Sequence, residues 1–132
     1  MSRDRGRLHL AVVVALAALV LFTACAPAVR QEPAQLTTAE GKEFRLARAV
    51  TVPLSTGYST TLQAGSRWQL VGGVAQGQVY RTRDHVVTVE GSDIHEAYIV
   101  VREGSLVGFY LPVKGTFSPV NPVVPLTTEW GG

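Results

Sequence analysis

The stretch "HEAYIVVREGSLVGFYLPV", residues 95–113, decides the fold. Two runs of strand-forming residues, His95–Gly104 and Ser105–Val113, meet at the dipeptide Glu103–Gly104. Two such runs joined by a short glycine-containing turn predict an antiparallel β-hairpin. No long amphipathic helical pattern elsewhere in the chain competes with this assignment.

Short runs of the same type precede this hairpin and are separated by glycine-containing stretches such as "GGVAQG". Six short strands within about 70 residues predict an all-β domain, an antiparallel sheet closed into a small barrel or sandwich. The strands expected before the hairpin are Arg45–Val52, Ser66–Val71, Gly77–Thr82 and His85–Gly91. The candidate core residues are Leu46, Val50, Leu62, Trp68, Leu70, Val79, Val87, Val89, Tyr98, Val100, Val107, Phe109 and Leu111.

The first 25 residues differ in composition from the rest of the chain. Residues 2–9 are polar and positively charged, and residues 10–22 are thirteen uninterrupted apolar residues. A helix that spans a bilayer needs about 20 apolar residues, so the shorter run fits the apolar part of a secretory signal. The small residues Thr23 and Ala24 follow, and then Cys25, the only cysteine of the chain.

The sequence "LFTAC", residues 21–25, resembles the lipobox of bacterial lipoproteins. The resemblance implies that the signal is cut between Ala24 and Cys25 and that Cys25 carries the membrane-anchoring lipid. Ala26 resembles the residue that directs such proteins to the outer membrane, facing the periplasm, in bacteria with two membranes. An ordinary signal peptide with a chance cysteine and an uncleaved anchor helix are the alternatives; in each case the remaining chain is exported.

We therefore expect four parts: a signal peptide (residues 1–24), a lipidated cysteine with a flexible tether (25–43), a compact β domain (44–117) and a Pro-rich tail (118–132). In the tail, Pro119, Pro122 and Pro125 recur at every third residue, the period of a polyproline II helix. The tail is expected to be extended along the domain or disordered; alternatively it is a docking peptide for an aromatic groove on a partner.

The charge balance excludes one class of function. The net charge of +2 comes from the first seven residues, because nine Lys or Arg and nine Asp or Glu follow from Cys25 onward. A protein that binds nucleic acid needs a cationic surplus on one face. No nucleic-acid partner is expected.

The sequence offers little for catalysis. No serine stands in a G-x-S-x-G elbow, and we expect no catalytic residue and no cofactor. Asp84 with His85, and Asp93 with His95 and Glu96, could hold a metal only if the two loops met, so they are expected to face water and no metal is expected. Arg81 and Arg83 alternate onto one strand face and form a candidate contact patch.

These observations favour a lipid-anchored envelope protein whose β domain is a structural or protein-interaction module, with the membrane and another envelope protein as partners. The alternative is an envelope binding protein or inhibitor that holds a small ligand, a glycan or an exported enzyme. A small envelope hydrolase is the least favoured hypothesis.

Overall fold

The predicted hairpin is present over residues 98–111 of the computed structural model, which describes residues 25–131. The start of its first predicted strand, residues 95–96, belongs instead to a short strand of another sheet. Strands β10 (Tyr98–Arg102) and β11 (Ser105–Leu111) are antiparallel, and Arg102 pairs with Ser105 across the turn. Both turn residues have positive φ, 52° at Glu103 and 75° at Gly104. This is the backbone of a two-residue turn whose twist matches that of the flanking strands.

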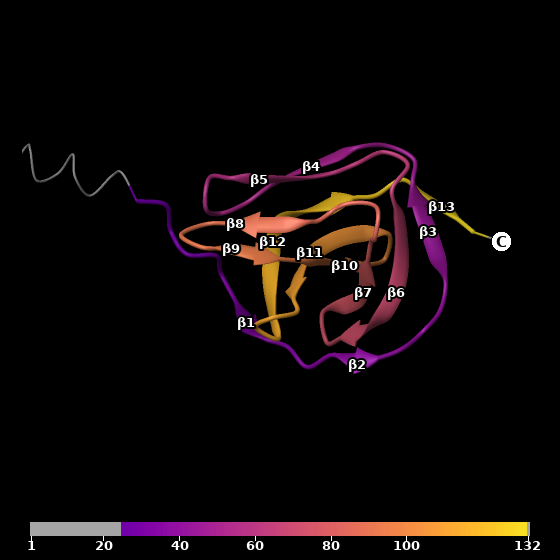
Figure 1. Ribbon diagram of the computed structural model, residues 1–132, viewed down its shortest axis with the longest axis horizontal. Helices are drawn as coiled ribbons and strands as arrows, with labels where there is room; N and C mark the ends of the chain where they lie inside the picture. Colours follow the sequence, from indigo (N-terminus) through magenta and orange to yellow (C-terminus); the bar gives the residue numbers. More distant parts are fainter. Residues whose placement is uncertain (1–24, 132) are drawn as a thin grey trace, which may run out of the picture.

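The hairpin lies in the middle of a nine-stranded antiparallel sheet, so the predicted all-β class is confirmed (Figure 1). The strands run in the order β1-β12-β11-β10-β7-β6-β3-β13, and β2 pairs with β6 beside β3. Their bounds are β1 (Glu32–Pro33), β2 (Thr37–Thr38), β3 (Glu43–Leu46), β6 (Arg67–Val74), β7 (Gly77–Arg81), β12 (Thr116–Pro125) and β13 (Thr128–Trp130). Two separate hairpins complete the sandwich-like body, one of β4 (Val50–Pro53) with β5 (Ser59–Leu62) and one of β8 (Thr88–Glu90) with β9 (Ile94–Glu96).

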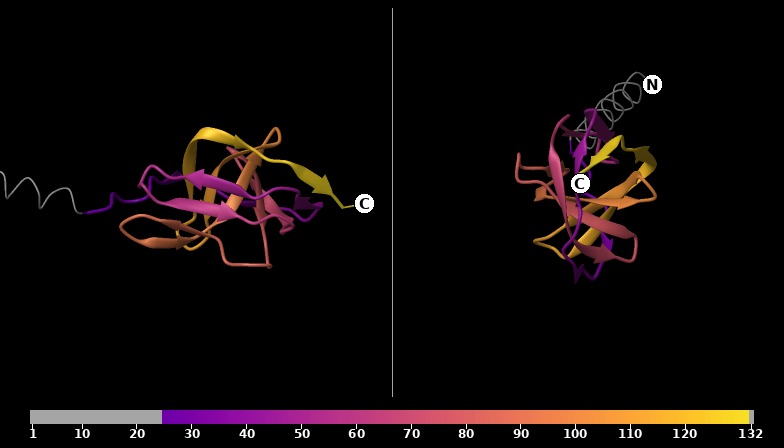
Figure 2. Two further views of the ribbon diagram at one scale, coloured as in Figure 1. Left: turned by 90° about the horizontal axis from the view of Figure 1, so that it is seen from above. Right: turned by 90° about the vertical axis from the view of Figure 1, so that its right-hand side faces the viewer.

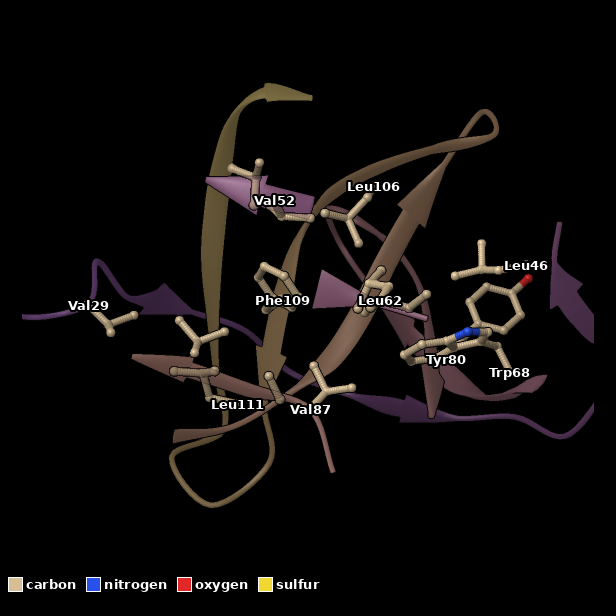
Figure 3. Close-up of a cluster of buried hydrophobic side chains, with 14 of the residues drawn as sticks. Val29, Leu46, Val52, Leu62, Trp68, Tyr80, Val87, Leu106, Phe109 and Leu111 are labelled. Carbon is tan, nitrogen blue, oxygen red and sulfur yellow. The ribbon is translucent and has the colours of Figure 1, made fainter. Parts of the chain in front are cut away.

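The main core lies between the large sheet and the two separate hairpins (Figure 3). Trp68, Phe44 and Phe109 are its largest fully buried side chains. From the hairpins, Val52, Leu62 and Val89 close the core. Burial of each such apolar side chain contributes about 1.5–3 kcal/mol, so this cluster dominates the stability of the body.

A second, smaller cluster lies on the opposite face of β7, β10 and β11. Alternation along β10 sends Ile99 to the main core and Val100 to this second cluster, which Val79, Tyr110 and Phe117 complete. The central strands are therefore buried on both faces. The sequence predicted Val100 as a core residue but missed Ile99, because a run that is apolar at every position does not tell one face from the other.

A β-bulge in β11 changes which residues face the core. Gly108 pairs with Val100 of β10 and Leu106 with the next residue, Val101, so Val107 is an extra residue in β11. Leu106 and Phe109 both enter the main core, while Val107 packs in the second cluster. The sequence predicted both Val107 and Phe109 as core residues, and simple alternation would put them on one face. They pack in different clusters because a bulge inserts one residue into the alternation.

The predicted single strand Arg45–Val52 is two strands in different sheets. Strand β3 ends at Leu46, and β4 begins at Val50. Between them the Ala47 amide donates to the Thr127 carbonyl at 2.9 Å, so the chain turns away where the C-terminal segment meets it. Strand β6, in contrast, continues through Gly72 and Gly73 to Val74, so the glycine-rich "GGVAQG" is not all loop.

The segment 25–43 is part of the body, which differs from the flexible tether that its composition predicted. Strand β1 pairs with β12, and β2 pairs with β6 on the far side of the sheet. Between them Ala34 and Leu36 pack over the second cluster. The reason is physical: the second face of the sheet is apolar, and this segment is what covers it.

The predicted boundary between residues 117 and 118 falls inside β12. This strand pairs with β11 from Thr116 to Pro125, and Val120 is buried in the main core. Strand β13 then pairs with β3. The stretch expected as an extended tail is thus an integral part of the sheet, because its alternate residues have apolar partners on β11.

Candidate functional site

The two ends of the described chain lie at opposite ends of the molecule, and each carries a candidate site (Figure 2). At the first end, Cys25 is exposed and has no disulfide partner. Ala24, the residue predicted before the cleavage point, and the predicted signal at residues 1–24 lie outside the described residues.

The chain is fixed to the body within two residues of Cys25. The Pro27 carbonyl accepts a hydrogen bond from the Ser92 amide at 3.0 Å, and the Val29 side chain is only 7% exposed in the main core. Ser92 belongs to the turn between β8 and β9. The start of the described chain is therefore attached to the tip of this hairpin.

Gly91 makes this attachment possible. A Cβ atom at Gly91 would lie 2.8 Å from the Pro27 carbonyl oxygen and 2.9 Å from both Val29 Cγ2 and Thr56 Cγ2. Thr56, in the turn between β4 and β5, donates from Oγ1 to the Glu90 carbonyl at 2.6 Å. Three segments that are distant in sequence thus meet around a position where only glycine fits.

Arg81 and Arg83, predicted as a contact patch, border the same open hollow of about 450 Å³, together with Glu40. The Arg81 guanidinium carbon lies 6.0 Å from the centroid of the Tyr98 ring, a cation–π distance that holds this arginine against the sheet. Arg83 is exposed in the loop after β7. Both arginines border this hollow although Arg83 lies beyond the end of β7, where strand alternation no longer applies, and the contact patch stays a prediction.

Pro119, Pro122 and Pro125 are all exposed along β12. In the described part of the chain, β12 has a strand on its outer side only at Thr116 and Phe117, where β1 pairs. Prolines have no N–H to donate, so they prevent a further strand from pairing with such an open edge. This gives the three prolines a structural role in the sheet, whatever contacts their exposed rings make.

At the end opposite Cys25, Trp130 lies over two aromatic rings. Its ring centroid is 5.2 Å from that of Phe44 and 6.3 Å from that of Tyr80, yet the side chain is 52% exposed. Trp130 borders an open groove of about 880 Å³ that Phe44, Arg45, Arg67 and Glu129 also line. Burial raises the pKa of the Tyr80 hydroxyl, which donates to Gln78 Oε1 at 2.9 Å.

Sequence reasoning missed this groove. It depends on the pairing of Trp130 with Phe44, which are far apart along the chain. The only local signal was a tryptophan close to the end of the sequence. A pairing of this kind is set by the tertiary fold and leaves no spacing pattern behind.

Beside the groove, Arg67 and Asp84 form an exposed ion pair. The Arg67 amide donates to Asp84 Oδ2 at 2.7 Å and its Nη2 donates to Oδ1 at 3.0 Å. These hydrogen bonds hold the pKa of the Asp84 carboxyl below its usual value and raise the pKa of the Arg67 guanidinium. Asp84 is therefore engaged in holding the loop after β7 to the start of β6.

The remaining candidate ligands do not converge. His85 lies edge-on to Trp68, with ring centroids 6.0 Å apart, while His95 stands opposite Val89 in the β8–β9 hairpin. Among residues 25–131, no group of three or more His, Cys, Asp or Glu side chains could hold a metal ion.

None of the described residues forms a helix long and apolar enough to cross a membrane. Comparisons of the chain with protein-family models, with curated proteins and with solved structures find no match.

Proposed function

We propose that this chain is a lipid-anchored protein of the cell envelope whose β domain presents an interaction surface to another envelope protein. The observation that carries the proposal is Cys25: the only cysteine of the sequence follows a charged start, a thirteen-residue apolar run and two small residues. Its thiol is exposed at the beginning of a body that holds together without a disulfide. Two acyl chains on such a cysteine would anchor the protein stably, since each buried methylene contributes about 0.8 kcal/mol.

The test of the anchor is Cys25→Ser in a bacterial host that processes lipoproteins, with Ala28→Ser as the matched control near the same site. We expect the parent and control proteins to sediment with membranes, and their N-terminal peptide to begin at Cys25 with the added mass of acyl chains. Cys25→Ser should lose the lipid and either leave the membrane or stay unprocessed. Acylation and processing of Cys25→Ser would contradict the anchor. Outer-membrane localisation is tested separately, by density separation of the two membranes where the host has both.

The interaction surface that we propose is the groove beside Trp130, at the end of the body farthest from Cys25. Exposed Trp and Arg side chains are enriched among the residues that dominate the binding energy of protein interfaces. Trp130 is already held by Phe44 and Tyr80, so its ring would lose little freedom on binding. The hollow bordered by Arg81 and Arg83 is a second, weaker candidate.

A photo-crosslinking residue in place of Trp130 tests this surface in intact envelopes, with the same residue in place of exposed Val113 as the control. We expect an adduct with a defined protein from position 130 only, and Trp130→Ala should weaken the binding of that purified protein at least tenfold. Equal adducts from both positions, or unchanged affinity of Trp130→Ala, would remove the groove from the proposal. Deleting the tail is no substitute, because residues 118–125 belong to β12.

The second candidate function is a binding protein or inhibitor that holds a small ligand, a glycan or an exported enzyme. One observation favours it: the groove combines an exposed indole with the charged side chains of Arg45, Arg67 and Glu129. Because Trp68 is fully buried, a ligand in the groove would change mainly the fluorescence of Trp130. Titration with soluble glycan fragments should then change the emission of the parent protein and not that of Trp130→Phe.

A further inference from the structure

We propose that the end of the body formed by the turns of the β4–β5 and β8–β9 hairpins lies directly on the phospholipid surface, with Ile94 and Tyr58 in the interfacial layer. This inference rests on the proposed lipid anchor at Cys25. It adds the orientation of the domain and a second, non-covalent contact with the membrane.

The link between Cys25 and the folded body is very short. Pro27 is hydrogen bonded to Ser92, and Val29 is buried, so Ala26 alone separates Cys25 from the body. Two extended residues span about 7 Å, whereas a free tether over residues 25–43 would span about 60 Å. A lipid on Cys25 therefore holds the β8–β9 turn within about 7 Å of the bilayer surface.

The turns of the β4–β5 and β8–β9 hairpins lie at the same end of the body as Cys25. The turns of both hairpins lie together on the side where the chain enters, and the two views in Figures 1 and 2 agree on this. Thr56 of one turn is hydrogen bonded to Glu90 of the other hairpin, which fixes the two turns to each other. Ile94 directly follows the β8–β9 turn and pairs with Glu90, while the Tyr58 carbonyl accepts from the Leu54 amide across the β4–β5 turn.

Two exposed side chains at this end, Ile94 and Tyr58, are of types that favour the membrane interface. Ile94 is 69% exposed and Tyr58 is 45% exposed. An exposed isoleucine beside a turn is costly in water and favourable in the acyl region, and a tyrosine prefers the depth of the headgroups. Trp130, which is 52% exposed, belongs to β13 at the opposite end of the body (Figure 1).

The charges of the β8–β9 turn indicate whether this contact depends on anionic lipids. Glu90 and Asp93 flank the β8–β9 turn, so the turn itself carries no positive charge that would attract anionic lipids. The contact should consequently depend on burial of Ile94 and Tyr58 and not on the charge of the headgroups.

The experiment uses the full chain, produced and lipidated in a bacterial host and reconstituted into phosphatidylcholine vesicles. An environment-sensitive fluorophore is attached at Ile94→Cys or Tyr58→Cys, with Glu129→Cys in exposed β13 as the control, and is quenched with brominated lipids. We expect strong quenching at positions 94 and 58 and background quenching at position 129. Addition of phosphatidylglycerol should leave quenching equal or reduce it.

A matched variant carries a Gly-Ser spacer of about 12 residues between Ala26 and Pro27. It should float with the vesicles as well as the parent protein does, and its quenching at position 94 should fall toward the value at position 129. Flotation with background quenching at positions 94 and 58 would overturn the orientation and leave the anchor standing. Failure of the parent protein to float would overturn the anchor, and the orientation with it.

Discussion

The two faces of the central strands are covered in different ways. On one face, the β4–β5 and β8–β9 hairpins place a contiguous apolar cluster over the sheet, with Trp68, Phe44 and Phe109 fully buried. On the other face, a thin segment that includes Ala34 and Leu36 covers a cluster of only a few side chains. The first cover provides stability by itself, whereas the second depends on two places where the N-terminal segment contacts the body closely.

Both of these places are glycines. Gly91 receives Pro27 and Val29, and a Cβ at Gly72 would meet the Thr37 carbonyl oxygen and lie 2.9 Å from Leu36 Cδ1. In the sequence these glycines look like ordinary strand breakers, but here they allow one backbone to approach another. The difference teaches that a segment without apolar periodicity can still belong to a domain if the body provides sites that accept it.

The largest expected effect on stability is on the face of the sheet that the two hairpins cover. Phe109→Ala should lower the free energy of unfolding by about 3–5 kcal/mol, because it removes a large ring from the fully buried centre of the main core. Chemical denaturation followed by fluorescence or circular dichroism measures this. Val123→Ala, an exposed position on β12, is the control and should change stability little. A loss below about 1 kcal/mol for Phe109→Ala would mean that the two faces do not differ as described.

The next effect concerns the site where the chain is attached. Gly91→Val should cost about 1–3 kcal/mol, because its side chain would overlap the Pro27 carbonyl and the Val29 methyl. Amide exchange at Ser92 should accelerate, since its N–H donates to Pro27. Ser92→Ala, an exposed neighbour, keeps this backbone bond and serves as the control. Unchanged exchange at Ser92 in Gly91→Val would show that the segment is not held there.

A smaller effect on stability is expected on the face of the sheet that the N-terminal segment covers. Leu36 is half-buried, so Leu36→Ala should cost about 1 kcal/mol. The change should be local: exchange should accelerate at the Ala39 amide, which donates to the Val71 carbonyl at 3.1 Å, and stay slow in β10 and β11. The exposed neighbour Gln35→Ala should alter neither quantity. Acceleration spread over the whole sheet would argue that both faces unfold as one unit.

The smallest effect is expected for the exposed Arg67–Asp84 pair, which holds the loop that leads toward the β8–β9 hairpin. The pKa of Asp84 is lowered by its hydrogen bonds from Arg67, so its contribution to stability is present above the usual value of 3.8 and is lost as pH falls through the lower folded-state value. Asp84→Asn should therefore reduce the melting temperature slightly at neutral pH. Below that range the two proteins should converge.

The Asp84→Asn comparison is made by thermal unfolding at a series of pH values, with Arg67→Gln as the partner variant. Arg67→Gln should cost less than Asp84→Asn, because the Arg67 amide still donates to Asp84 Oδ2 in that variant. The double substitution should cost little more than Asp84→Asn alone. A difference in melting temperature between Asp84→Asn and the parent protein that grows as the pH falls would contradict the expected pH dependence.

The sequence by itself determined the all-β class, the β10–β11 hairpin and about half of the main core. These features depend on local properties: apolar runs of strand length and a glycine at a turn where φ must be positive. The sequence also provided the candidate lipidation residue, because the order of charged, apolar and small residues before Cys25 is itself local.

The tertiary structure alone decided the rest. The bulge at Leu106–Gly108 redirected Val107, and the pairing of β13 with β3 placed Trp130 over Phe44. The predicted tether became the cover of the second face, because Gly72 and Gly91 left room for its backbone and an apolar cluster lay beneath it. Such contacts join residues far apart in the chain, so their free energy depends on shape at the point of contact, and no local pattern of residues records that shape.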